Sequence, residues 1–165
     1  MDKNSLHICS LEAVKEIDVS VYDGIITIED THIEEPFRVD RDGPEQLVPS
    51  FDDISVPMDG YVEPEEKHIH AALRFGYKIA KETGGSILIH CHAGISRSSA
   101  LALAIIAQRL GEGKEEEAVH QLEMINPNCR PNKSLVWKTD ELLGRNRKLY
   151  DTAYKMVWLT RLQRI

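Results

Sequence analysis

The chain has 165 residues, 42% of them hydrophobic, and a formal net charge of −7 at pH 7. This length is typical of one domain with a sizeable core, so we expect residues 1–165 to fold as a single domain. The acidic balance argues against sequence-independent binding of nucleic acid, which needs a basic surface. No run approaches the roughly 18 consecutive apolar residues of a membrane-spanning helix, so we expect no integral membrane segment.

The cysteines indicate a reducing compartment. There are three, Cys9, Cys91 and Cys129, an odd number without paired spacing, whereas the disulfide frameworks of secreted domains use even sets. The N-terminus also lacks the basic start and apolar run of a signal peptide. We therefore predict a cytoplasmic protein.

The front half of the chain alternates short extended runs with turns. Predicted strands cover residues 5–11, 24–28 and about 46–52, with a weak helix at 11–17. The second strand is β-branched and apolar enough to be buried on both faces. Residues 29–45 are charged and rich in turn residues, so they are predicted to form a loop.

The back half is predicted to be mainly helical. Pro64 suits a first helical position, where its missing N–H would be unsatisfied anyway, and Gly84-Gly85 ends that helix. A strand at 86–90 precedes helices at 98–110, 114–125, 134–143 and 145–162. Strands interleaved with helices, then helices alone, are typical of an α/β fold with a central, mostly parallel sheet flanked by helices.

The last predicted helix is basic and amphipathic. Residues 145–165 hold six Lys or Arg against Asp151 alone, a local charge of +5, so the rest of the chain carries −12. We expect its apolar side, which includes Trp158, to pack on the domain while the charges face water. The alternative is weak docking of this helix on a partner or on an anionic membrane.

Residues 90–99 read His-Cys-His-Ala-Gly-Ile-Ser-Arg-Ser-Ser, between a predicted strand and a predicted helix. Cys91 therefore lies at the end of the strand, and Arg97 lies where the helix begins. The five residues between them are enough for the backbone to curl around a tetrahedral oxyanion with its N–H groups pointing inward. Gly94 allows the tight curvature that such a loop needs.

This arrangement suits nucleophilic attack on phosphorus. The nucleophile is a thiolate, and a free cysteine, with a pKa of about 8.5, is mostly protonated at neutral pH. The start of the helix, the loop amides and the Arg97 guanidinium would all stabilise the anion. The guanidinium also offers a flat fork that matches two phosphate oxygens.

Two plainer interpretations compete with this one. A lone Cys91 would be a small buried core residue, as free cysteines often are. His90 and His92 would suit a zinc site at a strand end, but the decapeptide has no acidic residue to complete a ligand set, and Arg97 would repel a cation. We therefore predict no metal and no cofactor.

The string His-Cys-x5-Arg-Ser resembles the signature of the cysteine-dependent protein tyrosine phosphatase superfamily, and Ala-Gly-Ile-Ser-Arg-Ser most closely resembles its dual-specificity branch. The resemblance implies a single phosphatase domain of the dual-specificity fold, with Cys91 as nucleophile and Arg97 on the phosphate. Ser98 is expected to donate a hydrogen bond to the sulfur and to ease its departure. His90 is expected to orient the loop.

The resemblance also assigns phosphate binding to the loop. The residues concerned are His92, Ala93, Gly94, Ile95, Ser96 and Arg97. Phosphoinositide phosphatases of the superfamily carry lysines there, and this loop has none, which favours a single phosphomonoester on a protein substrate over a polyphosphorylated lipid. The chain has no room for the loop that deepens the pocket of the longer tyrosine-specific enzymes, so we expect a shallow cleft, with His92 on its solvent-facing rim.

The leaving oxygen of a phosphate ester needs a proton, which this superfamily takes from an aspartic acid in an earlier loop. Phe51-Asp52-Asp53 resembles such a loop, which makes Asp53 the predicted general acid and Asp52 its supporting neighbour. Asp53 precedes Cys91 by 38 residues, a long spacing that implies a few inserted residues around 55–62. Asp59, at 32 residues, is the alternative, although its Asp-Gly pair is typical of a turn.

The predicted activity is hydrolysis of phosphotyrosine, with phosphoserine or phosphothreonine as further substrates, through a phosphocysteine intermediate. One alternative is a non-catalytic phosphopeptide-binding module on the same fold, although Cys91 and Arg97 are both present. Another is arsenate reduction or the chemistry of low-molecular-weight phosphatases, which place Cys-x5-Arg near the N-terminus.

Overall fold

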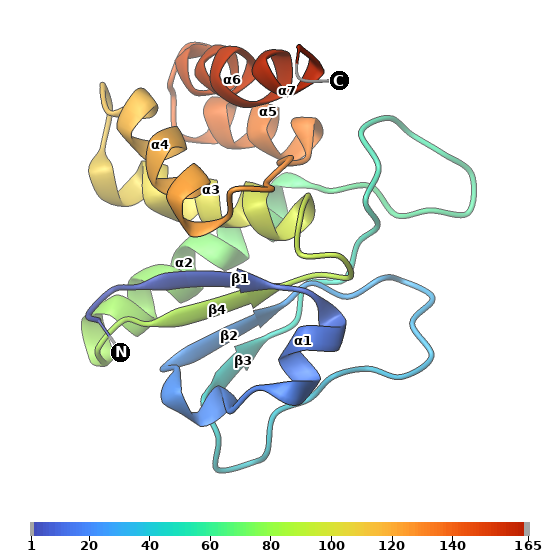
Figure 1. Ribbon diagram of the computed structural model, residues 1–165. Coiled ribbons are helices and arrows are strands. Elements are labelled where there is room, and N and C mark those ends of the chain that lie inside the picture. The colour runs from blue at the N-terminus through green and yellow to red at the C-terminus, as the bar shows by residue number, and fades with distance from the viewer. Residues whose placement is uncertain (1, 164–165) are drawn as a thin grey trace.

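The computed structural model describes residues 2–163 and contains a parallel sheet with helices on both faces (Figure 1). Within these residues the strand order is β1-β4-β2-β3. The strands are β1 (Leu6–Cys9), β2 (Gly24–Thr27), β3 (Glu45–Leu47) and β4 (Ile87–His90). All pairings are parallel, which confirms the predicted α/β class and brings the carboxyl ends of the strands to one edge.

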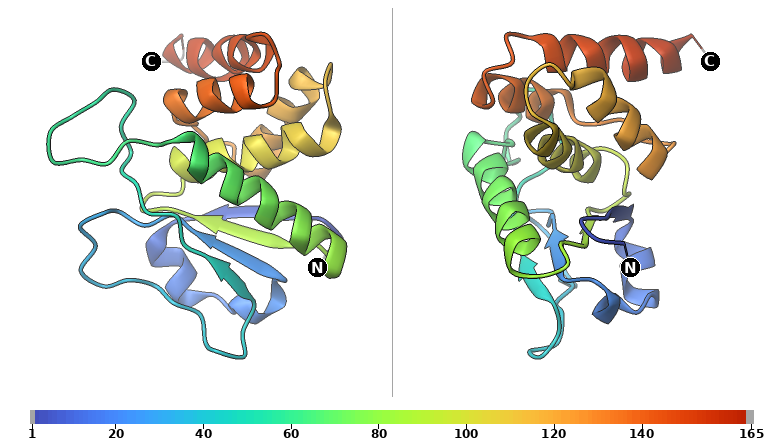
Figure 2. Two further views of the ribbon diagram at one scale, coloured as in Figure 1. Left: turned by 180° about the vertical axis from the view of Figure 1, so that it is seen from behind. Right: turned by 90° about the vertical axis from the view of Figure 1, so that its left-hand side faces the viewer.

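The helices divide unequally between the two faces of the sheet (Figure 2). They are α1 (Leu11–Glu16), a 3₁₀ turn (Val19–Val21), α2 (Glu66–Glu82), α3 (Arg97–Leu110), α4 (Glu115–Ile125), α5 (Lys133–Leu142), α6 (Lys148–Ala153), a π-helical segment (Tyr154–Leu159) and α7 (Thr160–Leu162). Ile25 and Leu88 pack with Val14 of α1, whereas Ile26 and Ile89 belong to the larger core on the other face. This split follows from the alternation of side chains along a strand.

The third strand is shorter than predicted. It covers Glu45–Leu47, and beyond it an isolated bridge joins Glu29 to Ser50. Pro49 lacks the N–H that a ladder needs, although its carbonyl still accepts from the amide of Glu29 at 2.9 Å. The chain therefore leaves the sheet just before residues 51–53, at the edge where β2 ends.

The first long helix begins two residues later than predicted. Helix α2 starts at Glu66, with Glu65 as its cap and Pro64 outside it. The reason is a side-chain contact, because the amide of Glu65 donates to Nδ1 of His68 at 2.9 Å. This bond fixes Glu65 as the last extended residue before the helix.

The expectation that the charges of residues 145–165 face water is wrong for Arg145. Its side chain is buried, with Nη1 3.3 Å from Oε1 of Glu115 and Nη2 donating to the carbonyl of Ala107 at 2.8 Å. The helix starts only at Lys148, because Asn146 and Arg147 adopt left-handed φ values of 53° and 69°. Residues 164–165 of the predicted basic segment lie outside the described residues.

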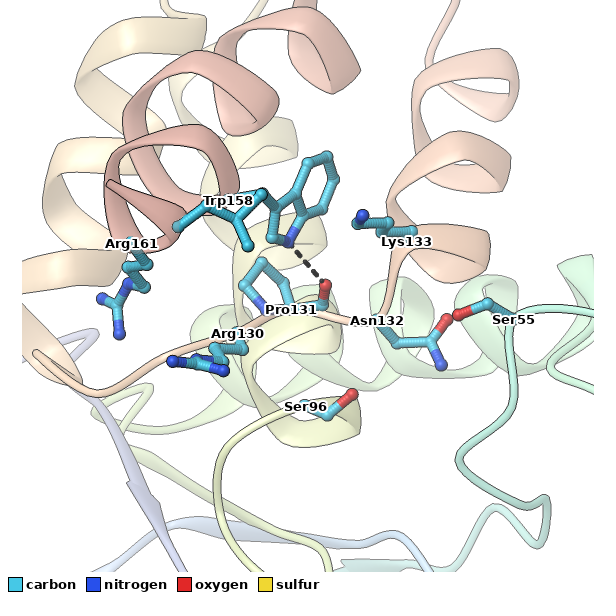
Figure 3. Close-up of a pocket in the computed structure, with 9 residues that line it drawn as sticks. Ser55, Ser96, Arg130, Pro131, Asn132, Lys133, Trp158 and Arg161 are labelled. Atoms are coloured by element: carbon cyan, nitrogen blue, oxygen red, sulfur yellow. Dashed lines mark hydrogen bonds between the residues drawn. The ribbon is translucent and has the colours of Figure 1, made fainter. Parts of the chain in front are cut away.

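The apolar side of the C-terminal helices packs on the rest of the molecule. Leu149, Ala153, Val157 and Trp158 all belong to the main core. The indole Nε1 of Trp158 donates to the carbonyl of Pro131 at 3.1 Å (Figure 3). These helices therefore lie against the segment that leads into α5.

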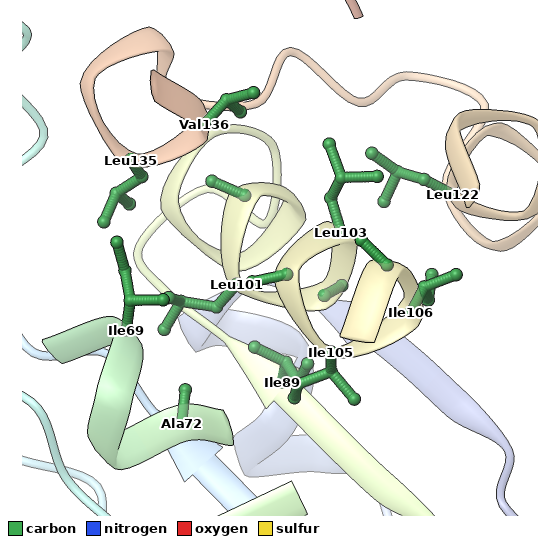
Figure 4. Packing of buried hydrophobic residues seen from close by; sticks show 14 of the residues in the cluster. Ile69, Ala72, Ile89, Leu101, Leu103, Ile105, Ile106, Leu122, Leu135 and Val136 are labelled. Carbon is green, nitrogen blue, oxygen red and sulfur yellow. The ribbon is translucent and has the colours of Figure 1, made fainter. Parts of the chain in front are cut away.

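Helix α3 runs through the centre of the core (Figure 4). Its buried side chains include Leu101, Leu103 and Ile105, which lie among side chains of α2, α4, α5 and β4. An apolar helix of this kind is expected where other elements cover it on all sides. Its position fixes the start of the helix, and with it Arg97, at the sheet edge. None of the helices in residues 2–163 is both long and apolar enough to cross a bilayer.

Candidate active site

The loop between β4 and α3 holds its carbonyl groups outward. Four of them accept hydrogen bonds from donors outside the loop. These are His92 O from Leu11 N (3.0 Å), Gly94 O from Asn126 Nδ2 (2.8 Å), Ile95 O from Arg130 N (2.9 Å) and Ser96 O from Asn132 N (3.2 Å). With the carbonyls engaged in this way, the loop's N–H groups are left for an anion on the inner side.

Cys91 lies at the base of this loop, only 3% exposed. Its Sγ accepts from the amide of Gly94 at 3.3 Å and lies 3.2 Å from Oγ of Ser98. The structure thus places Ser98 where it was expected to contact the sulfur. The other two cysteines differ, since burial raises the pKa of Cys9 and of Cys129 to about 11 and keeps both as thiols at neutral pH.

The Arg97 guanidinium is buried and is held through one of its nitrogens, Nη1. Its Nη1 donates to the carbonyl of Phe51 at 2.9 Å and pairs with Oδ1 of Asp30 at 2.7 Å. Its Nε is buried and has no hydrogen-bond partner among residues 2–163. A buried donor without a partner is costly, and the oxygens of a bound phosphate would satisfy it.

His90 links the loop to the interior of the sheet. Its Nε2 lies 2.8 Å from Oγ1 of Thr27, which in turn accepts from Nε2 of Gln46 at 2.7 Å. Its Nδ1 lies 3.4 Å from the carbonyl of Cys91. Burial lowers the pKa of His90 to about 4, so the ring is neutral at neutral pH. These contacts suit an orienting residue better than one that exchanges protons.

Asp53 reaches the signature loop, and Asp52 turns away from it. Oδ1 of Asp53 accepts from Oγ of Ser96 at 2.7 Å and from Nδ2 of Asn132 at 2.9 Å. Asp52 is buried and accepts from Thr31, through both its amide and its hydroxyl, and from the amide of Val62. Burial alone would raise the pKa of Asp52, but these hydrogen bonds and the charge of Arg97 hold it below its ordinary value. Asp52 therefore ties residues 51–53 to the neighbouring segments.

Asp59 is exposed and lies in a turn, next to Gly60 with a φ of 82°. Within residues 2–163, no hydrogen bond or ion pair joins its carboxylate to the signature loop. Its neighbour Gly60 instead uses its carbonyl to contact Nε2 of His32 at 3.3 Å. His92 is exposed as predicted, with Nδ1 3.9 Å from Oδ2 of Asp30.

Two polar residues of the site were missed from the sequence. Asp30 follows β2 and pairs with Arg97, and Asn132 caps α5 while it holds Asp53. Asp30 could have been identified from the sequence, because polar residues after adjacent parallel strands meet at the same sheet edge. Nothing in the sequence points to Asn132, since only the tertiary fold brings α5 to this edge. The described part of the chain contains no group of three His, Cys, Asp or Glu side chains that could hold a metal ion.

A cleft of about 460 Å³ opens beside the loop. Ser96 and Asn132, the two residues that hold Asp53, both line it (Figure 3). The other lining residues include three basic ones, Arg130, Lys133 and Arg161, together with Trp158. The signature loop and this basic cleft therefore share a wall.

Comparisons with known proteins agree with this geometry. The family model described as "Dual specificity phosphatase, catalytic domain" matches residues 29–139. Dual specificity protein phosphatase 12 of Rattus norvegicus is 33% identical over 88 residues, which are 52% of this chain but only 25% of that protein. This chain therefore matches about a quarter of that relative's length.

Solved structures share the fold at low sequence identity. The crystal structure of human DUSP28 has a TM-score of 0.66 at 16% identity and covers 87% of this chain and 94% of that one. That of DUSP15 has a TM-score of 0.62 at 22% identity and covers 93% and 92%. At these identities the likeness concerns the arrangement of the elements.

Proposed function

Because the chain belongs to the dual-specificity phosphatase family, we propose that it hydrolyses phosphomonoesters of proteins through a phosphocysteine intermediate. Phosphotyrosine is the first substrate, with phosphoserine and phosphothreonine as further ones. The observation that carries the proposal is the buried Arg97, held through Nη1 while its Nε has no partner among residues 2–163. A guanidinium presented in this way can grip two phosphate oxygens.

The reaction has two displacements. In the first, the Cys91 thiolate attacks phosphorus and forms a P–S bond, while the P–O bond to the substrate breaks and Asp53 gives its proton to the leaving oxygen. In the second, Asp53 takes a proton from water, whose oxygen attacks phosphorus, and the sulfur leaves as thiolate. Arg97 and the loop amides stabilise the equatorial oxygens in both steps. Ser98, near the sulfur, stabilises the departing thiolate.

The position of Asp53 supports its role as the general acid. Its carboxylate is exposed yet bound to the signature loop through Ser96, so a leaving oxygen above the loop would lie within its reach. A single carboxyl can serve as acid and then as base because the first step deprotonates it. The three free cysteines suit a reducing compartment, and a cytoplasmic setting is part of the proposal.

Substitution of the nucleophile tests the proposal. We expect Cys91→Ser to abolish turnover of para-nitrophenyl phosphate, because a serine hydroxyl is not ionised at neutral pH, while binding of a phosphotyrosine peptide persists. Acid quenching of the wild-type protein with a labelled substrate should trap a phosphocysteine. Cys129→Ser, at a buried cysteine outside the site, is the matched control and should retain turnover.

The same experiment separates the enzyme from a phosphopeptide-binding module. Tight binding of the peptide by the wild-type protein without any turnover would favour the module. Turnover that survives in Cys91→Ser would contradict the phosphocysteine mechanism.

A further inference from the structure

A basic cleft adjoins the signature loop and takes no part in the proposed chemistry. Its basic lining residues are Arg130, Lys133 and Arg161, and its apolar lining residues are Pro131, Trp158 and Leu162. In Figure 3, Arg130 and Arg161 lie on one side of the cleft and Lys133 on the other. Its volume of about 460 Å³ falls within the range of ligand-binding clefts.

The cleft is built rigidly onto the loop. The amides of Arg130 and Asn132 donate to the carbonyls of Ile95 and Ser96, respectively. On its far side, Trp158 is hydrogen-bonded to Pro131. The distance between the phosphate loop and the cleft is therefore fixed by the fold and does not depend on a mobile segment.

The cations of the cleft have no carboxylate partners. Among residues 2–163, no ion pair includes Arg130, Lys133 or Arg161. Arg161 instead donates to the carbonyl of Pro127 at 2.7 Å, and Nζ of Lys133 lies 5.4 Å from the centre of the Trp158 ring. The chain as a whole has a net charge of −7. The cleft, with three cations that have no acidic partners among these residues, is therefore a positively charged region on an acidic protein. Such a cleft attracts anions.

One carboxylate stands at the boundary. Oδ1 of Asp53 accepts from Ser96 of the signature loop and from Asn132, the cap of α5, and both of these residues line the cleft. Asp53 thus joins the signature loop to the wall of the cleft, an arrangement that fits two anionic groups on one substrate better than one large anion.

We propose that this cleft binds a second anionic group of the peptide substrate, a carboxylate or a further phosphate near the phosphorylated residue. The inference rests on the proposed phosphatase function, because the first group is the phosphate held by the loop. Leu162, which is exposed, together with Trp158 and Pro131 provides the apolar surface for the side chain that carries or neighbours the anion. The cleft therefore makes the enzyme selective for phosphorylated segments with acidic flanks.

The surroundings favour a peptide over an anionic membrane. Residues 29–35 contain four Asp or Glu and no Lys or Arg, and this segment follows β2 at the same end of the sheet as the signature loop (Figure 1). A membrane of anionic lipids would meet this acidic segment together with the cleft and be repelled. A peptide can enter the cleft alone.

Matched peptides test the inference. The substrates are one phosphotyrosine peptide with neutral flanks, a set with glutamate at each flanking position in turn, and the same set with phosphoserine. For the wild-type protein we expect kcat/KM to rise about tenfold for the best-placed anion, as is reasonable for charge-assisted contacts at a half-exposed site. In the double variant Arg130→Gln/Lys133→Gln the preference should fall to within about twofold.

The control variant is Arg41→Gln/Lys155→Gln, which removes the same charge at exposed positions outside the cleft. It should keep the wild-type preference, and loss of the preference there as well would overturn the inference in favour of general steering by charge. Equal rates on neutral and acidic peptides in the wild-type protein would also overturn it. Whether glutamate or phosphoserine gives the larger gain identifies the source of the anion.

Two further measurements distinguish a failure of this inference from a failure of the proposed function, and a peptide substrate from a lipid substrate. Para-nitrophenyl phosphate carries no second anion, so failure to turn it over would contradict the proposed function itself. Vesicles of phosphatidylcholine that contain a phosphorylated phosphatidylinositol test whether a lipid is the preferred substrate. Faster turnover of that lipid than of every peptide, lost in Arg130→Gln/Lys133→Gln, would overturn the peptide assignment.

Discussion

Asp30 holds the Arg97 guanidinium by one edge. Its Oδ1 lies 2.7 Å from Nη1, the same nitrogen that donates to the carbonyl of Phe51, and Nε stays without a partner among the described residues. Asp30 follows β2 and Phe51 follows β3, so the segments after two strands both hold the arginine. In the proposed mechanism, the guanidinium is therefore oriented before a phosphate binds, which reduces the cost of reaching the reactive geometry.

Removal of this carboxylate should lower the rate through Arg97. We expect Asp30→Ala to reduce kcat on a phosphotyrosine peptide about tenfold, because the guanidinium loses one of its two fixed partners. Asp30→Asn keeps an oxygen acceptor and should recover most of the rate. Asp42→Ala, at an exposed carboxylate, is the control and should match the wild-type protein. Steady-state measurement of kcat and KM checks this prediction, and equal loss in both Asp30 variants would contradict it.

The general acid can be identified from the leaving group. We expect Asp53→Asn to reduce kcat about a hundredfold on phenyl phosphate, whose leaving oxygen needs a proton, and much less on para-nitrophenyl phosphate, whose leaving group is stable as an anion. Asp59→Asn should leave both rates unchanged. The reverse pattern, with the loss confined to Asp59→Asn, would assign the acid to the turn.

Gly94 is restricted both by its positive φ and by the close approach of Cys9, whereas Gly113 is restricted only by its positive φ. Both have positive φ, 73° and 86°, but a Cβ on Gly94 would lie 2.7 Å from the carbonyl of Cys9, while nothing lies within 4 Å of one on Gly113. Either Ala substitution should lower the free energy of unfolding by about 1 kcal/mol from backbone strain. We expect Gly94→Ala to lose more stability and nearly all turnover, because the loop must shift away from Cys9. Urea denaturation and kcat/KM separate the two, and an active Gly94→Ala would show that the loop tolerates the shift.

Stability should depend on pH through His90. Its pKa is about 4 when folded, against an ordinary value of 6.5, so between these values the unfolded chain binds a proton that the folded protein does not. The free energy of unfolding should therefore fall as the pH drops, by about 2 kcal/mol between pH 7 and pH 5 from this group.

The variant His90→Gln should lose that part of the pH dependence. This holds even if its free energy of unfolding at pH 7 differs from that of the wild-type protein. His120→Gln, at an exposed histidine, is the control and should retain the wild-type dependence. Urea denaturation at the two pH values measures the difference for each protein. The same drop in His90→Gln as in the wild-type protein would contradict the assignment.

The signature loop was predictable because its parts are neighbours in the chain. Strand, Cys91, glycine, Arg97 and helix follow one another within a short stretch, so hydrophobic patterning and spacing determine their arrangement. The parallel sheet was predictable for a similar reason, since alternating strands and helices leave few topologies. Errors arose where a particular side-chain contact decides the outcome, as the local contact of His68 with Glu65 does for the start of α2 and the distant Glu115 does for the burial of Arg145.

The amino-acid sequence by itself determined the arrangement of the signature loop and the class of fold, because both depend on local patterns of apolar, small and charged residues. Only the tertiary structure decided that Asp30 holds Arg97, that Asn132 holds Asp53, and that Arg130 and Arg161 face one cleft. Those pairs come from segments far apart in the chain, and packing around α3 brings them together at the carboxyl edge of the sheet. Contacts of this kind are selected by the shape of the whole core, which no single stretch of residues specifies.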